Sequence, residues 1–171
     1  LIMTHSDDNG LVLPPKIAPC HCVIMPMIRD ESDRSKVMDF VHQITAVLQD
    51  TQFNGAAIRY QIDESSRRLG DKNWHWIKRG VPCRIEVGMR EVAEGKVVLA
   101  YRHEEVRQRS FLKLDALGRQ LPLQLEAMQQ ALYQRAQKRL DEQTYDFDSK
   151  EALIEFFEQG ANGFARFYWI E

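Results

Sequence analysis

The fold is decided by residues 21–62, which read HCVIMPMIRDESDRSKVMDFVHQITAVLQDTQFNGAAIRYQI. This stretch begins with a nearly continuous apolar run over residues 21–28, which is typical of a short strand buried on both faces of a sheet. Pro26 lies inside the run, and because proline has no N–H to donate, it indicates either the end of the strand or an edge position. The run therefore predicts the first strand of a domain that starts near residue 20.

A helix and a second strand complete the same stretch. Either Ser32 or Asp33 can cap the helix. Its apolar residues then recur at helical spacing, and they are Val37, Phe40, Val41, Ile44, Val47 and Leu48. Asn54-Gly55 predicts a turn into a strand over residues 56–62. A strand–helix–strand succession of this kind predicts two parallel strands joined by a right-handed crossover.

The same alternation of helices and strands continues to residue 115. The further elements that the pattern predicts are a helix over residues 65–79, a strand over 83–87, a helical turn over 89–94, and strands over 97–101 and 109–114. Gly80 and Pro82 end the longer helix. Five strands with helices between them predict an α/β domain over residues 20–115, in which helices flank a mixed sheet.

Residues 1–19 read as a linker in front of this domain. They contain the turn signal Asp7-Asp8-Asn9-Gly10, and the prolines at Pro14, Pro15 and Pro19 enforce an extended chain. The sequence also begins without a starting methionine, in what reads as the middle of an apolar strand. We therefore interpret the chain as a fragment whose upstream part is missing.

Residues 116–171 predict a small α+β appendage after the domain. It comprises a long helix over residues 121–143, a shorter helix over 149–159 and a strand-like aromatic run over 164–169. We expect Ser149 to cap the shorter helix. The aromatic rings of the final run are expected to fill a small second core rather than to bind a ligand.

Composition limits the classes of protein that this chain can represent. Its 171 residues are 44% apolar and 28% charged, as expected of a globular domain with an appendage. We expect neither a membrane span nor a signal peptide. Cys20, Cys22 and Cys83 are too irregularly spaced for a disulfide framework or a zinc site, which favours a reducing cytoplasm. On one strand, Cys20 and Cys22 would point to the same face, and we expect buried structural thiols.

The sequence offers little to support an enzyme that acts on its own. It contains no glycine-rich phosphate loop, metal-ligand cluster or nucleophile elbow. Cys20 beside His21 suggests an independent thiol enzyme as an alternative, but neighbours on a strand point to opposite faces and cannot share a proton. The five histidines are scattered singly. We therefore expect no catalytic residue and no bound metal in this chain.

Charge is distributed unevenly along the chain, although the net charge is only −2. Residues 67–90 carry seven basic and two acidic side chains, whereas residues 141–158 carry seven acidic side chains and one basic. Such an asymmetry suggests a basic patch that binds a polyanion. A solvated helix face explains the same charges equally well.

The densest part of the basic segment is residues 71–90, which read DKNWHWIKRGVPCRIEVGMR. Cations interleave there with Trp74 and Trp76, beside a strand whose polar face carries Arg84 and Glu86. Recognition of single-stranded RNA uses cations for phosphates, planar rings for unpaired bases and hydrogen-bonding groups for base edges. Arginine suits guanine because its fork donates to O6 and N7 together. The alternative is a structural ion pair of Arg84, with both tryptophans in the core.

Two motifs give the sequence a specific resemblance. Residues 2–19, IMTHSDDNGLVLPPKIAP, closely resemble the stretch that joins the catalytic and anticodon-binding domains in prolyl-tRNA synthetases of the archaeal and eukaryotic-like type. Residues 76–88, WIKRGVPCRIEVG, resemble that family's signature before its anticodon-reading strand. The resemblance covers essentially the whole chain and implies the anticodon-binding fold of a class II synthetase. It also implies that residues 1–19 end a catalytic domain and that residues 116–171 begin a further C-terminal domain.

Together with the charge pattern, the resemblance indicates which residues contact tRNA. Those that we expect to bind RNA are Lys72, Trp76, Lys78, Arg79, Arg84, Glu86 and Arg90. Arg84 and Arg90 match basic positions that read anticodon bases in the family, and Lys72 matches a basic position in the same segment. Arg67 and Arg68 are expected to contact phosphates together with Lys78 and Arg79.

Two positions depart from the family pattern. Some members carry an aromatic residue and a glutamate for base contacts where this sequence has Asn73 and Ile77. We expect their share of base recognition to be absent or to pass to neighbours, of which the candidates are Trp74, Trp76, Lys78 and Glu86.

The intact protein that the resemblance implies is a proline–tRNA ligase, a homodimer that activates proline with ATP. Its catalytic motifs lie upstream of Leu1, so we expect this chain alone to be inactive, monomeric and without ATP or zinc. We expect it to act in the cytoplasm on proline tRNA, with no membrane contact. The alternative is a stand-alone module of the same fold that binds another RNA or a protein.

Overall fold

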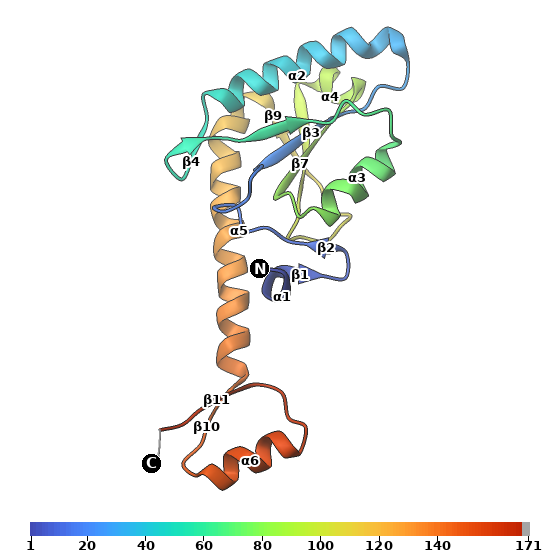
Figure 1. The fold of residues 1–171 in the computed structure, drawn as a ribbon. Coiled ribbons are helices and arrows are strands. Elements are labelled where there is room, and N and C mark those ends of the chain that lie inside the picture. Colours follow the sequence, from blue (N-terminus) through green and yellow to red (C-terminus); the bar gives the residue numbers. More distant parts are fainter. Residues whose placement is uncertain (169–171) are drawn as a thin grey trace. The chain divides into compact units, whose positions relative to one another are not determined.

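The computed structural model of this chain describes residues 1–168 (Figure 1). The chain divides into two compact units, Leu1–Leu132 and Tyr133–Glu171. The long helix α5 (Leu114–Glu142) continues from the first unit into the second. The first unit contains the whole of the α/β domain that the sequence predicts.

Five strands form the main sheet of the described residues, in the order β6-β3-β7-β8-β9. Their bounds are Cys22–Pro26 for β3, Tyr60–Ile62 for β6, Cys83–Val87 for β7, Lys96–Tyr101 for β8 and Ser110–Lys113 for β9. β3 is parallel to β6 and β7, whereas β8 is antiparallel to both β7 and β9. The predicted mixed sheet and parallel pair are confirmed, and the first strand ends at Pro26.

Helices cover both faces of this sheet (Figure 1). One face packs against α2 (Arg34–Gln49) and α5, and the main apolar core lies between them. The core residues include Cys22, Ile24, Ile44, Leu48, Ile85, Leu99, Leu117 and Leu121. The opposite face packs against α3 (Leu69–Lys78) through a smaller cluster, which consists of Cys20, Val23, Met25, Trp76 and Val81. The short helix α4 (Met89–Glu94) connects β7 to β8.

The start of α2 differs from the predicted cap. Asp33 occupies the position before the helix, but its side chain makes no capping hydrogen bond. Asp30 instead caps a short 3-10 helix, η1 (Glu31–Asp33), by accepting a hydrogen bond from the N–H of Ser32 at 2.9 Å. The prediction that Ser32 or Asp33 provides the cap is wrong, because a 3-10 turn precedes the helix and moves the capping carboxylate upstream.

The second predicted strand is interrupted. Its first part is β5 (Ala56–Ala57), which pairs with β4 (Gln52–Phe53) across the turn at Asn54-Gly55. Both turn residues have a positive φ, 52° and 76°, as a tight hairpin turn requires. The chain joins the main sheet only at β6. One strand over residues 56–62 was therefore a wrong prediction, because the turn forms a small hairpin of its own.

The long helix starts at Leu114 rather than at residue 121. Pro122 lies inside it and removes one backbone hydrogen bond. Leu117 and Leu121 are fully buried in the main core, and their burial offsets this cost. Gly118 lets the helix approach the end of α2 closely, since a Cβ there would lie 3.0 Å from Oγ1 of Thr51. The strand before the helix is correspondingly shorter than residues 109–114.

The N-terminal segment is docked on the first unit. It forms a short helix, α1 (Ile2–His5), and a hairpin of β1 (Ser6–Asp7) and β2 (Gly10–Leu11) at the predicted turn. Arg102 anchors the hairpin: its Nη1 and Nη2 donate to the Asp7 carboxylate at 2.8 and 2.6 Å, and its Nε donates to the carbonyl of Ile77 at 3.0 Å. Hydrogen bonding by Arg102 lowers the pKa of Asp7. The linker is thus tied to the end of α3.

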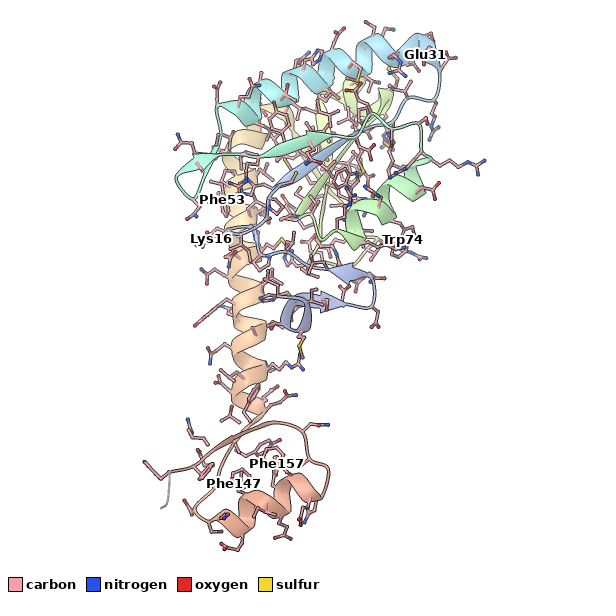
Figure 2. All side chains as sticks on the ribbon, viewed as in Figure 1. Lys16, Glu31, Phe53, Trp74, Phe147 and Phe157 are labelled. Atoms are coloured by element: carbon pink, nitrogen blue, oxygen red, sulfur yellow. The ribbon has the colours of Figure 1, made fainter. Side chains whose placement is uncertain are left out.

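The second unit contains a small aromatic cluster. β10 (Thr144–Asp146) pairs in parallel with β11 (Phe164–Arg166), and α6 (Lys150–Glu158) lies between them in sequence. Ser149 caps α6 as predicted, by accepting from the N–H of Ala152 at 3.2 Å. The cluster rings are Tyr145, Phe147, Phe156 and Phe157, and Figure 2 labels Phe147 and Phe157 beside α6.

The final aromatic run of the second unit does not fill a core. Phe164, Phe167 and Tyr168 are exposed, while Trp169 lies outside the described residues. The prediction that these rings form the second core is wrong for the described ones. The alternation of the short strand β11 turns Phe164 outward, whereas the rings around α6 pack on one another.

Candidate nucleic-acid interface

The helix α3 presents two of its sides to different surroundings. Trp76 and Ile77 are buried against the domain. Gly70, Asn73, Trp74 and Ile77 recur at helical spacing and line an open cavity of about 400 Å³, together with Val106, Arg107 and Arg109 from the loop before β9. Trp74 remains 46% exposed on this helix (Figure 2). The cavity is of the size that a small ligand or one nucleobase occupies.

Asp63, at the end of β6, fixes the inner side of α3. Its Oδ2 accepts a hydrogen bond from Nε1 of Trp76 at 2.7 Å, and its carbonyl accepts one from Nζ of Lys72, also at 2.7 Å. Burial favours a higher pKa for Asp63, but hydrogen bonds from Ser65 and Trp76 outweigh it and lower the pKa. Lys72 and Trp76, both expected to contact RNA, are therefore buried and occupied in holding the helix to the sheet.

Arg84 lies at the inner end of the candidate interface. It is only 1% exposed, and its Nε donates to Oδ1 of Asn73 at 3.0 Å. Within residues 1–168, its two terminal nitrogens have no hydrogen-bond or ion-pair partner. Burial, followed by the nearby charge of Arg109, lowers the pKa of Arg84 to about 10. The guanidinium is thus charged at neutral pH and has uncommitted donors.

A second arginine, Arg109, joins the same site from the loop that leads into β9. Nη2 of Arg109 lies 3.1 Å from Oε1 of Glu86, and its Nη1 donates to the carbonyls of Val106 and Gln108 at 2.8 and 2.9 Å. Arg109 was not among the residues expected to bind RNA, because it lies at the end of a loop and faces Glu86 only once the sheet has formed. The site accordingly combines Arg84, Arg109 and Glu86.

The other expected RNA contacts are spread over the surface. Lys78 and Arg79 are exposed at the end of α3, and the guanidinium carbon of Arg79 lies 5.5 Å from the ring centroid of Trp76. Arg90 is 79% exposed and pairs with Glu94 at 3.2 Å, beyond the carboxyl end of β7. Arg84 is thus buried on β7, whereas Arg90 is exposed on α4.

Arg67 and Arg68 line a different hollow. This cavity, of about 570 Å³, lies at the carboxyl ends of β3 and β6, and Arg29 and Arg34 are also part of its lining. Acidic side chains line it as well, among them Asp63, whose contacts hold α3. Of the basic residues in segment 67–90, Arg67, Arg68 and Lys72 line this cavity, whereas the arginines that line the cavity beside Trp74 are Arg107 and Arg109.

The cysteine region has the properties of a packed interior. All three thiols are free and buried, as expected. Cys20 precedes β3 and belongs to the α3 cluster, whereas Cys22 belongs to the main core, so the expectation that they share a face is wrong. Burial raises the pKa of Cys20 to about 11 and lowers that of His21 to about 4. These directions oppose an activated thiolate pair.

The described residues contain neither a metal-ligand group nor a helix that could span a membrane. Across residues 1–168, no three histidine, cysteine or acidic side chains are grouped so as to hold a metal ion. In the same part of the chain, no helix has the length and apolarity to cross a membrane.

The chain is similar to known proteins along its whole length. The family model described as "Anticodon binding domain" matches residues 21–118. Among curated relatives, the proline–tRNA ligase of Bdellovibrio bacteriovorus is 37% identical over 100% of this chain, and that of Roseiflexus sp. (strain RS-1) is 39% identical over 99%. The chain covers 35% and 34% of those relatives, so it spans about a third of their length.

Solved structures give the same result. The prolyl-tRNA synthetase of Cryptosporidium parvum, complexed with L-proline and AMP, matches 94% of this chain with a TM-score of 0.81 and 29% identity. The match covers 33% of that protein. The same synthetase complexed with halofuginone and AMPPNP matches 98% of the chain, with a TM-score of 0.82 and 28% identity.

Proposed function

This chain belongs to the family of anticodon-binding domains, and from that premise we propose that it recognises the anticodon loop of proline tRNA as one part of a proline–tRNA ligase. The relatives that share its whole length carry that ligase name, and the similarity runs through the segments on both sides of the family match. The proposed reaction belongs to the whole protein, which would join proline to tRNA at the expense of ATP. This chain would contribute RNA recognition.

The observation that carries the proposal is the state of Arg84. A buried charge is costly unless hydrogen bonds satisfy it, and only the Nε of this guanidinium has a partner within the described residues. The terminal N–H groups of Arg84 can donate hydrogen bonds to two neighbouring acceptor atoms on one edge of a ligand. Guanine presents such a pair, O6 and N7, to an arginine fork. We therefore assign Arg84 to the recognition of an anticodon guanine, with Asn73 orienting its guanidinium.

The cavity beside Arg84 suits the body of an unpaired base. Trp74 provides an exposed ring for stacking, and Ile77 provides an apolar wall. The two departures from the family pattern, Asn73 and Ile77, both lie in this cavity. Glu86 can accept a hydrogen bond from a base amine while Arg109 neutralises its charge. We propose that Trp74 and Glu86 take over the contacts that the departures remove.

The remaining cations are assigned to the phosphate backbone. Arg67, Arg68, Lys78 and Arg79 surround α3, and phosphate contacts there would set the position of the loop without reading its sequence. We assign Arg90 to the same group, because it is exposed on α4, beyond the end of the strand that carries Arg84. Lys72 and Trp76 act indirectly by holding α3 in place.

The whole protein that we propose is a cytoplasmic homodimer of the archaeal and eukaryotic-like type. The solved relative that binds L-proline and AMP supports the assignment of ATP to the complete enzyme. The present chain is proposed to be inactive by itself, monomeric and without a bound cofactor, because its matched family model is the recognition domain.

A binding experiment with matched hairpin RNAs tests the proposal. One hairpin carries a proline anticodon, and the other carries adenines in place of its guanines. Arg84→Lys keeps the charge but loses the fork, and we expect it to lose about 1–3 kcal/mol of binding on the guanine hairpin alone. Lys78→Ala should weaken both hairpins equally.

Two controls distinguish a loss of base recognition from a loss of folding. Thermal melting shows whether Arg84→Lys remains folded, and Asn73→Ala leaves Arg84 in place while removing the acceptor that orients it. Equal losses on both hairpins for the Arg84 and Asn73 variants would contradict base recognition at this site. A wild-type chain that does not distinguish the two hairpins would contradict the proposed function itself.

A further inference from the structure

The strand β9 exposes a large aromatic ring on the outer part of the sheet. Phe111 is 65% exposed, and Lys113 on the same strand is also exposed. Ser110 and Leu112 are half-buried, and Leu112 packs against the main core. Because side chains alternate along a strand, Phe111 and Lys113 point away from that core, towards the face that carries α3.

Strand register places Phe111 on the same face as the candidate interface. Phe111 pairs with Val98, and Val98 pairs with Glu86, so the three residues form one row across β9, β8 and β7. Arg84 lies in the next row on that face, opposite Ala100. Two strand spacings separate Phe111 from the β7 residues, which is roughly 10 Å.

The charges around Phe111 favour an anionic partner. Arg109 lies two residues before Phe111, in the loop that leads into β9, and its side chain extends to Glu86. Arg107 lines the neighbouring cavity, and Lys113 is exposed on the same strand as the ring, while Lys96, opposite Lys113, is paired with Glu94 at 3.0 Å. An exposed ring among cations on a sheet is the arrangement that stacks a base of a single strand while the cations meet its phosphates.

We propose that Phe111 is a stacking platform for a second unpaired base, adjacent in the RNA strand to the base read at Arg84. The proposal rests on the proposed function and extends its interface from α3 across β7 and β8 to β9. Stacking tolerates any base, because every base has a π-face. Phe111 therefore contributes affinity and positions the loop, whereas Arg84 contributes discrimination.

Substitutions of Phe111 in the full chain provide the test, with the proline anticodon hairpin as the probe. Phe111→Ala should weaken binding by roughly 5- to 150-fold, as expected for the loss of one base–aromatic stack. Phe111→Leu keeps an apolar side chain without a π-face and should lose nearly as much. Phe111→Tyr should restore binding to within about 3-fold of the wild type.

Additional readouts distinguish stacking from a structural role. The ratio of affinities for the guanine and adenine hairpins should not change in Phe111→Ala, and the slope of log affinity against log salt should stay the same because no phosphate contact is lost. Tyr133→Ala, at an aromatic that is 60% exposed on α5, is the matched control and should bind normally. The hairpin with 2-aminopurine in its loop should show quenched fluorescence on binding to the wild type but not to Phe111→Ala.

The outcomes separate this inference from the proposed function. Unchanged affinity in Phe111→Ala, while Arg84→Lys still loses discrimination, would overturn the inference and leave the function intact. Equal affinity of Phe111→Leu and the wild type would also overturn it, because apolar contact alone would then suffice. A lower melting temperature for Phe111→Ala, with binding recovered on cooling, would assign the residue to stability and likewise overturn stacking.

Discussion

On β7, Cys83, Ile85 and Val87 face α2 and α5, whereas Arg84 and Glu86 face α3. The first face is packed with apolar side chains that satisfy one another. The second face buries charged groups, and the described part of the chain supplies only some of their partners. Alternation along β7 thus places stabilising residues on one face of the sheet and candidate recognition residues on the other.

The largest effect is expected on the apolar face. Ile85→Ala should lower the free energy of unfolding by about 2–5 kcal/mol, because it leaves a cavity in the main core. Chemical denaturation measures the loss, and hairpin binding by the folded fraction should retain its preference for guanine. If the guanine preference disappeared together with stability, the separation of the two faces would be incorrect.

The second effect depends on pH and concerns His21, which is buried outside both apolar clusters. Nδ1 of His21 accepts a hydrogen bond from the N–H of Arg59 at 3.0 Å, and burial lowers its pKa to about 4. In the unfolded chain the His21 imidazole takes up a proton near pH 6.5, whereas in the folded chain it stays neutral until the pH approaches 4. Stability is therefore complete above pH about 6.5 and falls by about 2–3 kcal/mol as pH approaches 4.

Denaturation at stepped pH values measures this fall. His21→Gln remains neutral throughout and should flatten the curve between those two pH values. The same slope in His21→Gln and in the wild type would assign the acid sensitivity to other groups.

A third, smaller effect is expected on the α3 face. Trp76→Phe should cost about 1–3 kcal/mol of stability, because Asp63 loses a buried donor. Trp74→Phe on the same helix is the matched control, and since Trp74 is exposed it should change stability little. Similar melting temperatures for the two variants would argue that Asp63 does not fix α3.

The smallest effect on stability is expected for Arg90→Ala. Its ion pair with Glu94 is solvent-exposed, so the free energy of unfolding should change by less than about 0.5 kcal/mol. Binding of both hairpins should weaken equally, and the salt slope should decrease by about 1. A selective loss on the guanine hairpin would instead make Arg90 a base reader.

Local patterns were sufficient to predict much of the fold. The apolar run over residues 21–28 and the periodicity of α2 predicted the central strand and its covering helix, because those signals lie within one element. The predicted start of α5 at residue 121 was wrong, because the burial of Leu117 and Leu121 in the main core accompanies a helix that begins at Leu114. Local sequence patterns therefore predicted most of the helices and strands, whereas tertiary packing determined the residues at which they begin and end.

The candidate site was less accessible to sequence reasoning. Arg84 and the departures Asn73 and Ile77 were found through family resemblance, and all three lie at or beside one cavity. Phe111 and Arg109 were missed, because strand register across β7, β8 and β9 decides what they face. Burial of Lys72 and Trp76 depends likewise on Asp63, which belongs to another element.

The docked N-terminal hairpin has a mechanical consequence. Gly80 adopts φ 72°, and a Cβ there would lie 2.6 Å from the carbonyl oxygen of Leu11. Arg102 holds the hairpin and the carbonyl of Ile77 at the same time. Because these contacts join the hairpin directly to the end of α3, we expect a displacement of the linker to move α3 with it. The linker and α3 are thus expected to move together.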